Sequence, residues 1–253
     1  MSNVENVPPV NERKMTAPGV NYEAARALLD AVCLPDGEYP EGDTSSVYFD
    51  TPDFRFLGEK DDGDNFKTKL RLRWYDVGVG TAGNGRSGGQ NKAAESGGAE
   101  VERKVIPAFL EIKLRFGAAR DKFRKRITID AARAATAIPG DGFFESVAAE
   151  AARDWEPCAM IPPALPAMII ISYNRRRHIC PFTGSRVALD TRIRAERFNP
   201  AFFTAPAPVA VPDTVCEFKN NTLATPPWLR ALEANGFRLR SFSKYGTLCE
   251  LAK

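Results

Sequence analysis

The stretch K-T-K-L-R-L-R-W-Y, residues 67 to 75, decides the fold because basic and apolar side chains alternate along it. Successive side chains of a β-strand point to opposite faces of a sheet, so residues two apart share a face. The basic row consists of Lys67, Lys69, Arg71 and Arg73. The other row, Leu70, Leu72 and Trp74, is apolar. The stretch therefore predicts a strand with one charged face and one buried face.

The same alternation recurs along the chain. Further strands are predicted at residues 45–51, 109–116, 122–129, 168–178, 186–196, 215–219 and 237–244. Their charged rows consist of Glu111, Lys113 and Arg115; Lys122, Arg124 and Arg126; Tyr173, Arg175 and Arg177; Arg186 and Asp190; and Glu217 and Lys219, with Glu12 and Lys14 as a further pair. Helices are predicted after Asn21, after Asp130, over residues 142–155 and over residues 225–236. The fold class is α+β, mainly antiparallel β, with helices packed outside the sheet.

The sign of the charged rows points to a function. Any single row is compatible with the solvated outer face of a half-buried sheet. Cations side by side repel one another, however, and an ordinary surface mixes Lys with Glu for cross-strand pairing. If the sheet curls into a closed or nearly closed barrel with these rows inward, it forms a cationic tunnel. Such a tunnel suits a polyphosphate chain.

Length and composition set further bounds. The chain has 253 residues with 43% hydrophobic and 26% charged residues, which predicts one globular domain over residues 1–253. A Gly- and Ser-rich segment at about 78–100 predicts a flexible loop insertion. A net charge of +3 is too small to argue for nucleic-acid binding. We expect no direct membrane insertion and a cytoplasmic protein, while a membrane-bound partner remains open.

Histidine and cysteine usage excludes some kinds of site. His178 is the only histidine, so zinc sites with two histidine ligands are excluded, and we interpret His178 as structural. The five cysteines are scattered without a C-x-x-C motif. We expect reduced, mostly buried thiols.

Three Glu-x-Lys pairs offer metal ligands beside phosphate-binding ammonium groups. The pairs are Glu12 and Lys14, Glu111 and Lys113, and Glu217 and Lys219. Carboxylate oxygens suit Mg²⁺ or Mn²⁺, and these cations bridge phosphate oxygens during phosphoryl transfer. A single Glu-x-Lys pair is a very weak signal, so the pairs gain meaning only together with the cationic rows.

The ordered set of motifs resembles the VTC domain, the polyphosphate polymerase module of the vacuolar transporter chaperone family in the triphosphate tunnel (CYTH-like) superfamily. The motifs are S-S-V-Y-F-D-T (45–51), K-L-R-L-R-W-Y (69–75), F-L-E-I-K (109–113), Y-N-R (173–175), R-V-A-L-D-T (186–191), C-E-F-K (216–219) and S-F-S-K-Y (241–245). The resemblance extends over nearly the whole chain, from Glu12 to Tyr245. The order of the motifs is far more specific than any one of them.

The resemblance implies an antiparallel tunnel that moves the γ-phosphate of ATP onto a growing inorganic polyphosphate chain. ATP and inorganic polyphosphate or pyrophosphate are then the partners, and Mn²⁺ or Mg²⁺ is the cofactor. The implied catalytic cations are Arg71, Arg73, Lys113, Arg175 and Lys219. The implied substrate-binding residues are Lys14, Tyr173, Arg186, Ser243 and Lys244. Glu217 is the implied metal ligand, with Glu12 and Glu111 as further candidates, and Lys67, Lys69, Lys122, Arg124 and Arg126 are candidates for the tunnel mouth.

The sequence departs from the superfamily pattern near its N-terminus. The superfamily pattern Glu-x-Glu-x-Lys is present only in its second half, because Val10 occupies the first acidic position. Phe49 is interpreted as a core residue and Asp50 as a hydrogen-bond partner at a strand end. The alternative functions are a triphosphate or thiamine triphosphate hydrolase on the same fold, and a non-catalytic polyphosphate-binding module. Retention of Glu217 favours catalysis over simple binding.

Overall fold

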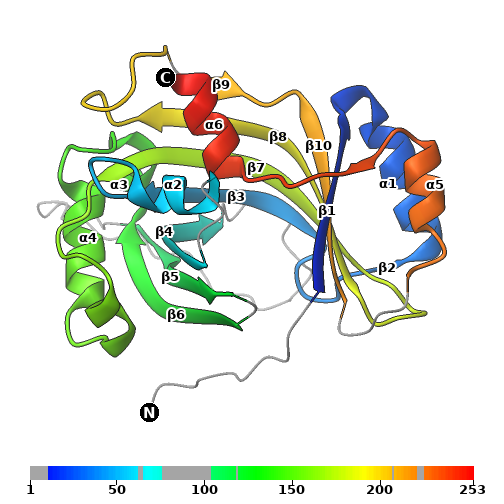
Figure 1. The fold of residues 1–253 in the computed structure, drawn as a ribbon, viewed down its shortest axis with the longest axis horizontal. Coiled ribbons are helices and arrows are strands. Elements are labelled where there is room, and N and C mark those ends of the chain that lie inside the picture. Colours follow the sequence, from blue (N-terminus) through cyan, green and yellow to red (C-terminus); the bar gives the residue numbers. More distant parts are fainter. Residues whose placement is uncertain (1–10, 62–64, 76–103, 118, 207, 221–224) are drawn as a thin grey trace, which may run out of the picture.

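The computed structural model describes residues 11–61, 65–75, 104–117, 119–206, 208–220 and 225–253 (Figure 1). The predicted loop insertion at 78–100 and Val10 lie outside the described residues. The strands are β1 (Asn11–Pro18), β2 (Leu34–Pro35), β3 (Glu41–Phe49), β4 (Phe66–Tyr75), β5 (Val105–Phe116), β6 (Ala119–Asp130), β7 (Ala167–Ile179), β8 (Arg186–Phe198), β9 (Val209–Ala210), β10 (Asp213–Asn220) and β11 (Arg238–Leu239). The helices are α1 (Tyr22–Val32), α2 (Arg55–Asp61), α3 (Ala131–Thr136), α4 (Phe143–Ala152), α5 (Leu229–Ala234) and α6 (Lys244–Ala252).

All the described strands belong to one antiparallel sheet. Its order is β11-β1-β10-β8-β7-β3-β4-β5-β6, with β2 beside β7 and β9 beside β8. In this path the edges at β11 and β6 are not hydrogen-bonded to each other within the described residues. The prediction of a closed or nearly closed barrel is therefore confirmed only in part: the mainly antiparallel α+β class is confirmed, whereas the described strands do not close into a barrel.

The sheet is nevertheless strongly curved. Lys113 on β5 interacts electrostatically with Lys219 and Glu217 on β10 and with Glu12 on β1. Between β5 and β10 lie five strand spacings of about 4.8 Å, or about 24 Å in a flat sheet. Charges at that separation are largely screened in water. The charged rows therefore line a concave face on which both ends of the sheet approach each other.

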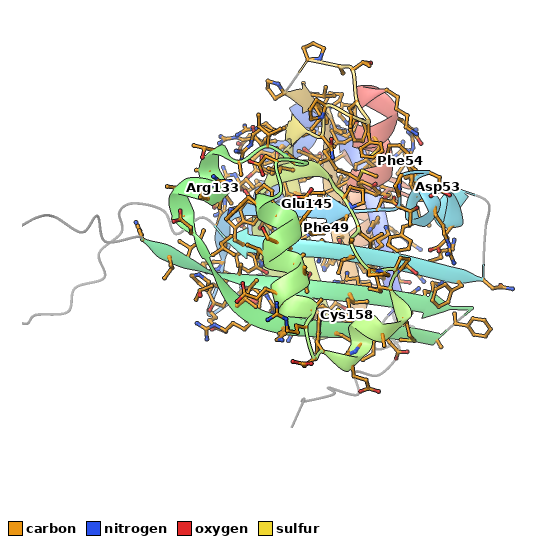
Figure 2. All side chains as sticks on the ribbon, turned by 90° about the vertical axis from the view of Figure 1, so that its left-hand side faces the viewer. Phe49, Asp53, Phe54, Arg133, Glu145 and Cys158 are labelled. Atoms are coloured by element: carbon orange, nitrogen blue, oxygen red, sulfur yellow. The ribbon has the colours of Figure 1, made fainter. Side chains whose placement is uncertain are left out.

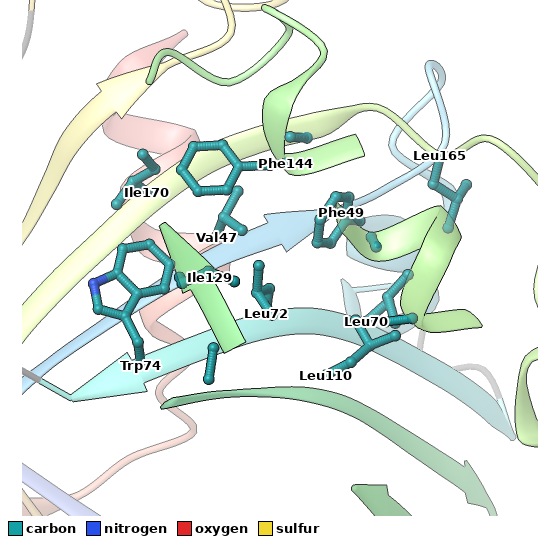
Figure 3. Close-up of a cluster of buried hydrophobic side chains, with 14 of the residues drawn as sticks. Val47, Phe49, Leu70, Leu72, Trp74, Leu110, Ile129, Phe144, Leu165 and Ile170 are labelled. Carbon is teal, nitrogen blue, oxygen red and sulfur yellow. The ribbon is translucent and has the colours of Figure 1, made fainter. Parts of the chain in front are cut away.

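Helix α4 covers the convex face over β3, β4 and β5. The β4 residues Leu70, Leu72 and Trp74 point to this side with the neighbouring apolar residues of β3 and β5 (Figure 3). Phe144 of α4 stacks on Trp74, with ring centroids 5.9 Å apart. Figure 2 shows α4 crossing these strands, and the ammonium of Lys125 on β6 donates to a carbonyl at the end of the helix. This layer buries the apolar side of the alternating pattern.

Helices α1 and α5 cover the other part of the convex face, over β1, β8 and β10 (Figure 1). Their core includes Leu29 of α1 and Leu232 of α5, both fully buried against Phe218 of β10. The helix predicted after Asn21 is confirmed, as is the closing glycine of α5, because Gly236 has φ 84°. Glycine adopts this left-handed conformation without steric cost.

Helix α6 breaks the expected arrangement because it packs on the concave face. Its residues Tyr245 and Leu248 contact Tyr48 of β3 and Ile171 of β7, which belong to the concave side. The strand predicted over residues 237–244 is wrong beyond β11. The Ser243 side chain accepts a hydrogen bond from the Gly246 N–H, as an N-cap does, so a helix begins at Lys244.

Asp50 anchors this helix. Its carboxylate accepts hydrogen bonds from the backbone N–H groups of Phe56 and Leu57 and from the Tyr245 hydroxyl, at 2.8, 3.0 and 2.8 Å. The interpretation of Asp50 as a strand-end hydrogen-bond partner is confirmed. Phe49 is 2% exposed, which confirms its place in the core.

Candidate phosphate-binding face

The concave face collects cations from seven strands, β1, β4, β5, β6, β7, β8 and β10, and from the start of α6. Register pairs follow across the sheet, from Lys122 through Lys113 to Lys69 and from Arg124 through Glu111 to Arg71. At the other end, Lys219 lies opposite Arg186 on one side and Glu12 on the other. The predicted inward row on each strand is thus confirmed as one continuous face.

Arg71 lies near the centre of this face. Its Nε donates to Glu111 Oε2 at 2.7 Å, and its Nη1 donates to the Tyr48 hydroxyl at 3.1 Å. Burial works against ionisation of Glu111, but Arg71 and Arg73 outweigh it and hold the pKa of this carboxyl well below its usual range. Lys122 and Arg124 also contact Glu111, at 3.5 and 3.4 Å. Glu111 therefore holds Arg71, Lys122 and Arg124 close together through ion pairs.

Arg73 is held by hydroxyl groups. Its Nε donates to Ser46 Oγ at 3.1 Å, and its Nη2 donates to the Tyr173 hydroxyl at 3.0 Å. The residue is 9% exposed, and both of these hydrogen-bond partners are neutral hydroxyl groups. A buried guanidinium oriented by neutral partners keeps its full charge for an anionic ligand. The hydroxyl of Tyr173, expected to contact phosphate, orients this arginine.

Arg175 forms the most tightly held ion pair on the face. Its Nε and Nη2 donate to the two carboxylate oxygens of Asp190 at 2.6 and 2.7 Å. Lys244 at the start of α6 donates to the same carboxylate. Burial opposes ionisation of the fully buried Asp190, but Arg175 and Lys244 outweigh it and lower its pKa. Asp190 therefore locks a strand cation and a helix cation into one arrangement.

The two outer Glu-x-Lys pairs form a checkerboard. Glu12 lies opposite Lys219, and Lys14 lies opposite Glu217, so each carboxylate has an ammonium both along and across the strands. Within the strands, Lys14 lies 3.3 Å from Glu12 and Lys219 lies 3.0 Å from Glu217. Burial opposes ionisation of Glu217, but Lys219 and Arg175 outweigh it and hold its pKa well below its usual range. Glu217 is thus a permanent anion among cations.

Lys113 occupies the least favourable position for a charge. Burial, together with nearby Arg71 and Lys219, lowers the pKa of its ammonium well below the usual range. Glu217 and Glu12 act in the opposite direction but with smaller effect. A phosphate bound here would restore the charged form, because an anion within about 4–6 Å favours ionisation of an ammonium.

The remaining predicted residues lie around this centre. Ser243 caps α6 and also lies 3.5 Å from the ammonium of Lys69. Arg186 is exposed at the first position of β8, and Arg124 stacks on the Phe109 ring at 3.5 Å. The basic residues Lys67 and Arg126 follow the same inward rows toward the ends of β4 and β6. The structure brings the predicted residues onto one face, while their roles stay predictions.

The carboxylates of the face fit a metal ion that is also bound by phosphates of the substrate. Within the described part of the chain, no group of three or more His, Cys, Asp or Glu side chains is arranged to hold an ion. Glu217 uses one oxygen on Lys219 and the other on Arg175, 3.5 Å away. A protein cage for the metal is therefore not formed, whereas Mg²⁺ commonly binds through one or two carboxylates plus substrate phosphates. Glu217 and Glu12 fit that second mode.

Some residues of the face were missed by the sequence reasoning. Asp190 was seen to share a face with Arg186, but no role was assigned to it. Ser46 and Tyr48 lie in a recognised motif without a predicted contact. The two-residue spacing of Ser46 and Tyr48 is the sequence feature that could have identified them, because they share a face and lie opposite Arg73 and Arg71. The lone His178 is buried outside this face and bonds Asp30 at 2.8 Å, which agrees with a structural interpretation.

A family model decides the relationship: the VTC domain matches residues 9–253. The chain belongs to the VTC domain family. No curated protein matches this VTC domain. Its membership and its cationic concave face together support a role in binding or processing polyphosphate or triphosphate.

Three solved structures are similar to the chain at low sequence identity. A "putative adenylate cyclase" from Bacillus halodurans has 15% identity and a TM-score of 0.49, with 94% of each chain covered. A second protein of that description, from Vibrio parahaemolyticus, has 11% identity and a TM-score of 0.42, covering 94% of this chain and 97% of the other. A Pyrococcus horikoshii protein has 10% identity and a TM-score of 0.39, covering 96% and 100%. At such values the similarities say nothing about activity.

Among the described residues, no helix has both the length and the apolar character to cross a bilayer.

Proposed function

We propose that this VTC domain is a polyphosphate polymerase that transfers the γ-phosphate of ATP to the end of an inorganic polyphosphate chain. The observation that carries the proposal is the set of buried cations on the concave face, of which Arg73 and Lys113 lack a close carboxylate partner in the contacts described above. Such cations are unfavourable together in the protein alone and become favourable with a polyanion bound.

Two groups of cations come from different parts of the sheet. Arg71, Arg73 and Lys113 come from β4 and β5, whereas Arg175, Lys219 and Lys244 come from β7, β10 and α6. Transfer between two phosphates requires donor and acceptor to be held in line against their mutual repulsion. Cations on both sides of the reacting bond satisfy this requirement. Which group holds the donor remains open in this proposal.

The protonation states favour transfer to a phosphate over transfer to water. Attack by water is helped by a general base, whereas the end of a polyphosphate chain is already ionised. The four carboxylates of the face, Glu12, Glu111, Asp190 and Glu217, each form an ion pair with Lys or Arg. The pKa values of Glu111, Asp190 and Glu217 are lowered, which makes these groups weak bases. None of these three carboxylates is therefore a strong general base for the activation of water.

A divalent metal belongs to the proposal. Glu217, with Glu12 beside it, would hold Mn²⁺ or Mg²⁺ together with phosphate oxygens of the substrate. When bound, the ion would neutralise charge that develops on the transferred phosphoryl group. The cations of the chain would orient the phosphates, and the low pKa of Glu217 keeps this ligand ionised at neutral pH.

The test measures three products in one reaction. Purified protein is incubated with ATP, Mn²⁺ and a short polyphosphate primer, and ADP, free phosphate and chain length are resolved. We expect ADP release to match chain growth, with little free phosphate. Lys14→Ala should slow growth, whereas Arg13→Ala should not, because Arg13 neighbours Lys14 on β1 but points to the convex face against Phe218.

The alternatives give different products. Equal amounts of ADP and free phosphate without longer chains would replace the polymerase with a triphosphate hydrolase. Thiamine triphosphate tested in the same way separates the two hydrolase substrates. Tight primer binding without any ADP release would leave a non-catalytic binding module.

A further inference from the structure

Cys33 and Cys180 are cross-strand neighbours on the convex face, away from the phosphate-binding face. β2 pairs with the end of β7, and Leu34 lies opposite Ile179. Continuing this antiparallel register by one residue places Cys33 opposite Cys180. The Cys180 side chain also contributes to raising the pKa of the Cys33 thiol, which agrees with this register. Both thiols are free and buried.

The position in the ladder suits a covalent link. The Asp36 N–H donates to the Arg177 carbonyl at 3.0 Å, which identifies the pair Pro35 and His178 as lying between two hydrogen bonds. Antiparallel positions alternate, so the pair two residues along, residues 33 and 180, is also of the type without direct hydrogen bonds. Cα atoms of such pairs lie about 4.5 Å apart. Disulfides span Cα distances of about 4.4–6.8 Å.

The two sulfurs have unequal surroundings. Trp228 Nε1 donates to the Cys180 sulfur at 3.4 Å, and Thr183 and the backbone N–H of Phe182 add hydrogen bonds. Burial opposes ionisation of Cys180, but these donors outweigh it and lower its pKa. Burial raises the pKa of Cys33 to about 12. Cys180 is therefore the nucleophilic sulfur, and Cys33 keeps its proton beside it.

We propose that Cys33 and Cys180 form a redox-active pair that closes to a disulfide when the protein meets a peroxide. The turn after Cys180 lies at the surface, where Phe182 is 72% exposed, so a molecule as small as hydrogen peroxide has a short path to the sulfur. The link would join the end of α1 to the β7–β8 turn. That turn leads directly into Arg186, at the edge of the phosphate-binding face.

The chemistry balances with hydrogen peroxide as the oxidant. The Cys180 thiolate attacks one peroxide oxygen, the O–O bond breaks, and hydroxide leaves, which gives a sulfenic acid. The Cys33 sulfur then attacks the Cys180 sulfur, the S–S bond forms, and the S–O bond breaks. The leaving hydroxide takes the Cys33 proton as water. Two thiols lose two electrons in total, and one peroxide becomes two waters.

The three other cysteines set the selectivity. Cys158 is the more accessible thiol, but it lies on the opposite part of the convex face, in the layer of α4 (Figure 2). Cys249 belongs to α6, where it hydrogen-bonds Tyr245. Cys216 lies in the same core as Cys33 and is its electrostatic neighbour, but burial raises its pKa far above the usual range. Cys216 is therefore the competitor that the experiment must distinguish.

The test uses the full chain with hydrogen peroxide as the only oxidant. After treatment, free thiols are alkylated, the protein is digested without reductant, and linked peptides are identified by mass spectrometry. We expect one dominant link between Cys33 and Cys180, loss of two of the five thiols, and full recovery with dithiothreitol. Because this measurement needs no variant, it does not depend on a substituted protein folding.

Variants sharpen the assignment. Cys33→Ser should leave a trappable sulfenic acid at Cys180, and Cys180→Ser should leave Cys33 reduced. Cys158→Ser is the matched control and should give the same link in the same yield. Oxidation confined to Cys158, or a dominant link between Cys180 and Cys216, would overturn the proposal.

Discussion

The concave face of the sheet has two halves, one apolar and one charged. The apolar half lies under α6, where Ile169, Ile171 and Leu248 are completely buried. The charged half includes Arg175, which follows Ile171 and Tyr173 on the same face of β7, and Arg73 on β4. Both halves face inward, so burial alone does not separate them. The apolar half is complete as it stands, whereas the charged half becomes electrostatically favourable only with an anion.

Tyr48 lies on the border between the halves. Its ring stacks on Tyr245 of α6 with centroids 5.1 Å apart, and its hydroxyl accepts a hydrogen bond from Arg71. The aromatic ring belongs to the apolar half and the oxygen to the charged half. Helix α6 therefore contributes to both halves: its apolar side chains fill one half, and Lys244 at its start lies in the other. Substitutions in the two halves should therefore separate stability from turnover.

Leu248→Ala tests the apolar half and should have the largest effect. Leu248 is fully buried against the concave face. Its truncation should lower the free energy of unfolding by about 2–5 kcal/mol, measured by urea denaturation. Leu251→Ala on the same helix is the control, since Leu251 is 51% exposed and should cost little. Equal losses for the two variants would contradict the packing of α6 described above.

Glu217→Gln tests the charged half at the proposed metal ligand. We expect metal-dependent turnover to fall by about a hundredfold or more, because a neutral amide no longer holds the ion, while triphosphate binding survives on intact cations. Steady-state ADP release and calorimetric binding measure the two quantities. Glu233→Gln, on the exposed side of α5, should change neither. Unchanged turnover of Glu217→Gln would remove this residue from the mechanism.

Arg73→Ala and Arg175→Ala test the two groups of cations. Each removes at least one charge-assisted phosphate contact, worth roughly 1.5–3 kcal/mol, so chain synthesis should slow about tenfold to a hundredfold. Arg176→Ala is the matched control, because Arg176 neighbours Arg175 but points to the convex side toward Asp30. A slowdown as large in Arg176→Ala would show that strand integrity, and not the charged face, had been measured.

Tyr48→Phe tests the border and should have the smallest effect. Burial opposes ionisation of Tyr48, but Arg71 and Arg73 outweigh it and lower its pKa to about 8. Above that pH a phenolate competes with phosphate for Arg71, so triphosphate should bind severalfold more weakly at pH 9 than at pH 7. Absorbance at 295 nm should show one tyrosine ionising near pH 8, absent in Tyr48→Phe. Tyr22→Phe on α1 should keep that step.

Rising pH should weaken triphosphate binding, but it should increase the free energy of unfolding of the protein without ligand. An unfolded tyrosine ionises near pH 10, so between pH 8 and 10 the unfolded state binds more protons than the folded state. The Tyr48 contribution to stability therefore grows as pH rises through this window and disappears below it. Denaturation at pH 7.5 and 9.5 should show the gain only with Tyr48 present.

Local rules predicted much of the fold. The alternation placed strands close to β4, β6, β7, β8 and β10, and Asp130 caps α3 by accepting from the Arg133 N–H at 2.9 Å, as its position indicated. The inward rows of cations were likewise readable from the two-residue period. These features depend on neighbours within one strand or one helical turn, which a sequence displays directly.

A β-bulge in β8 interrupts the two-residue alternation of side chains from which the charged rows were predicted. Arg192 has φ 53°, and the register of β7 with β8 shifts by one residue at this point. Beyond it Ile193 faces the concave side, and Arg194 faces the other. A strict two-residue alternation from Asp190 would have added Arg192 and Arg194 to the charged face. The bulge therefore ends the charged half and begins the apolar half.

The sequence by itself determined which side chains share a face, because strand geometry fixes alternation without reference to anything distant. It also determined the family through the order of its motifs. Only the tertiary structure decided that the sheet stays open, that α6 fills half of the concave face, and that Asp190 joins Arg175 to Lys244. These features depend on how far the sheet curves and on contacts between residues far apart in the chain, and no local pattern records either.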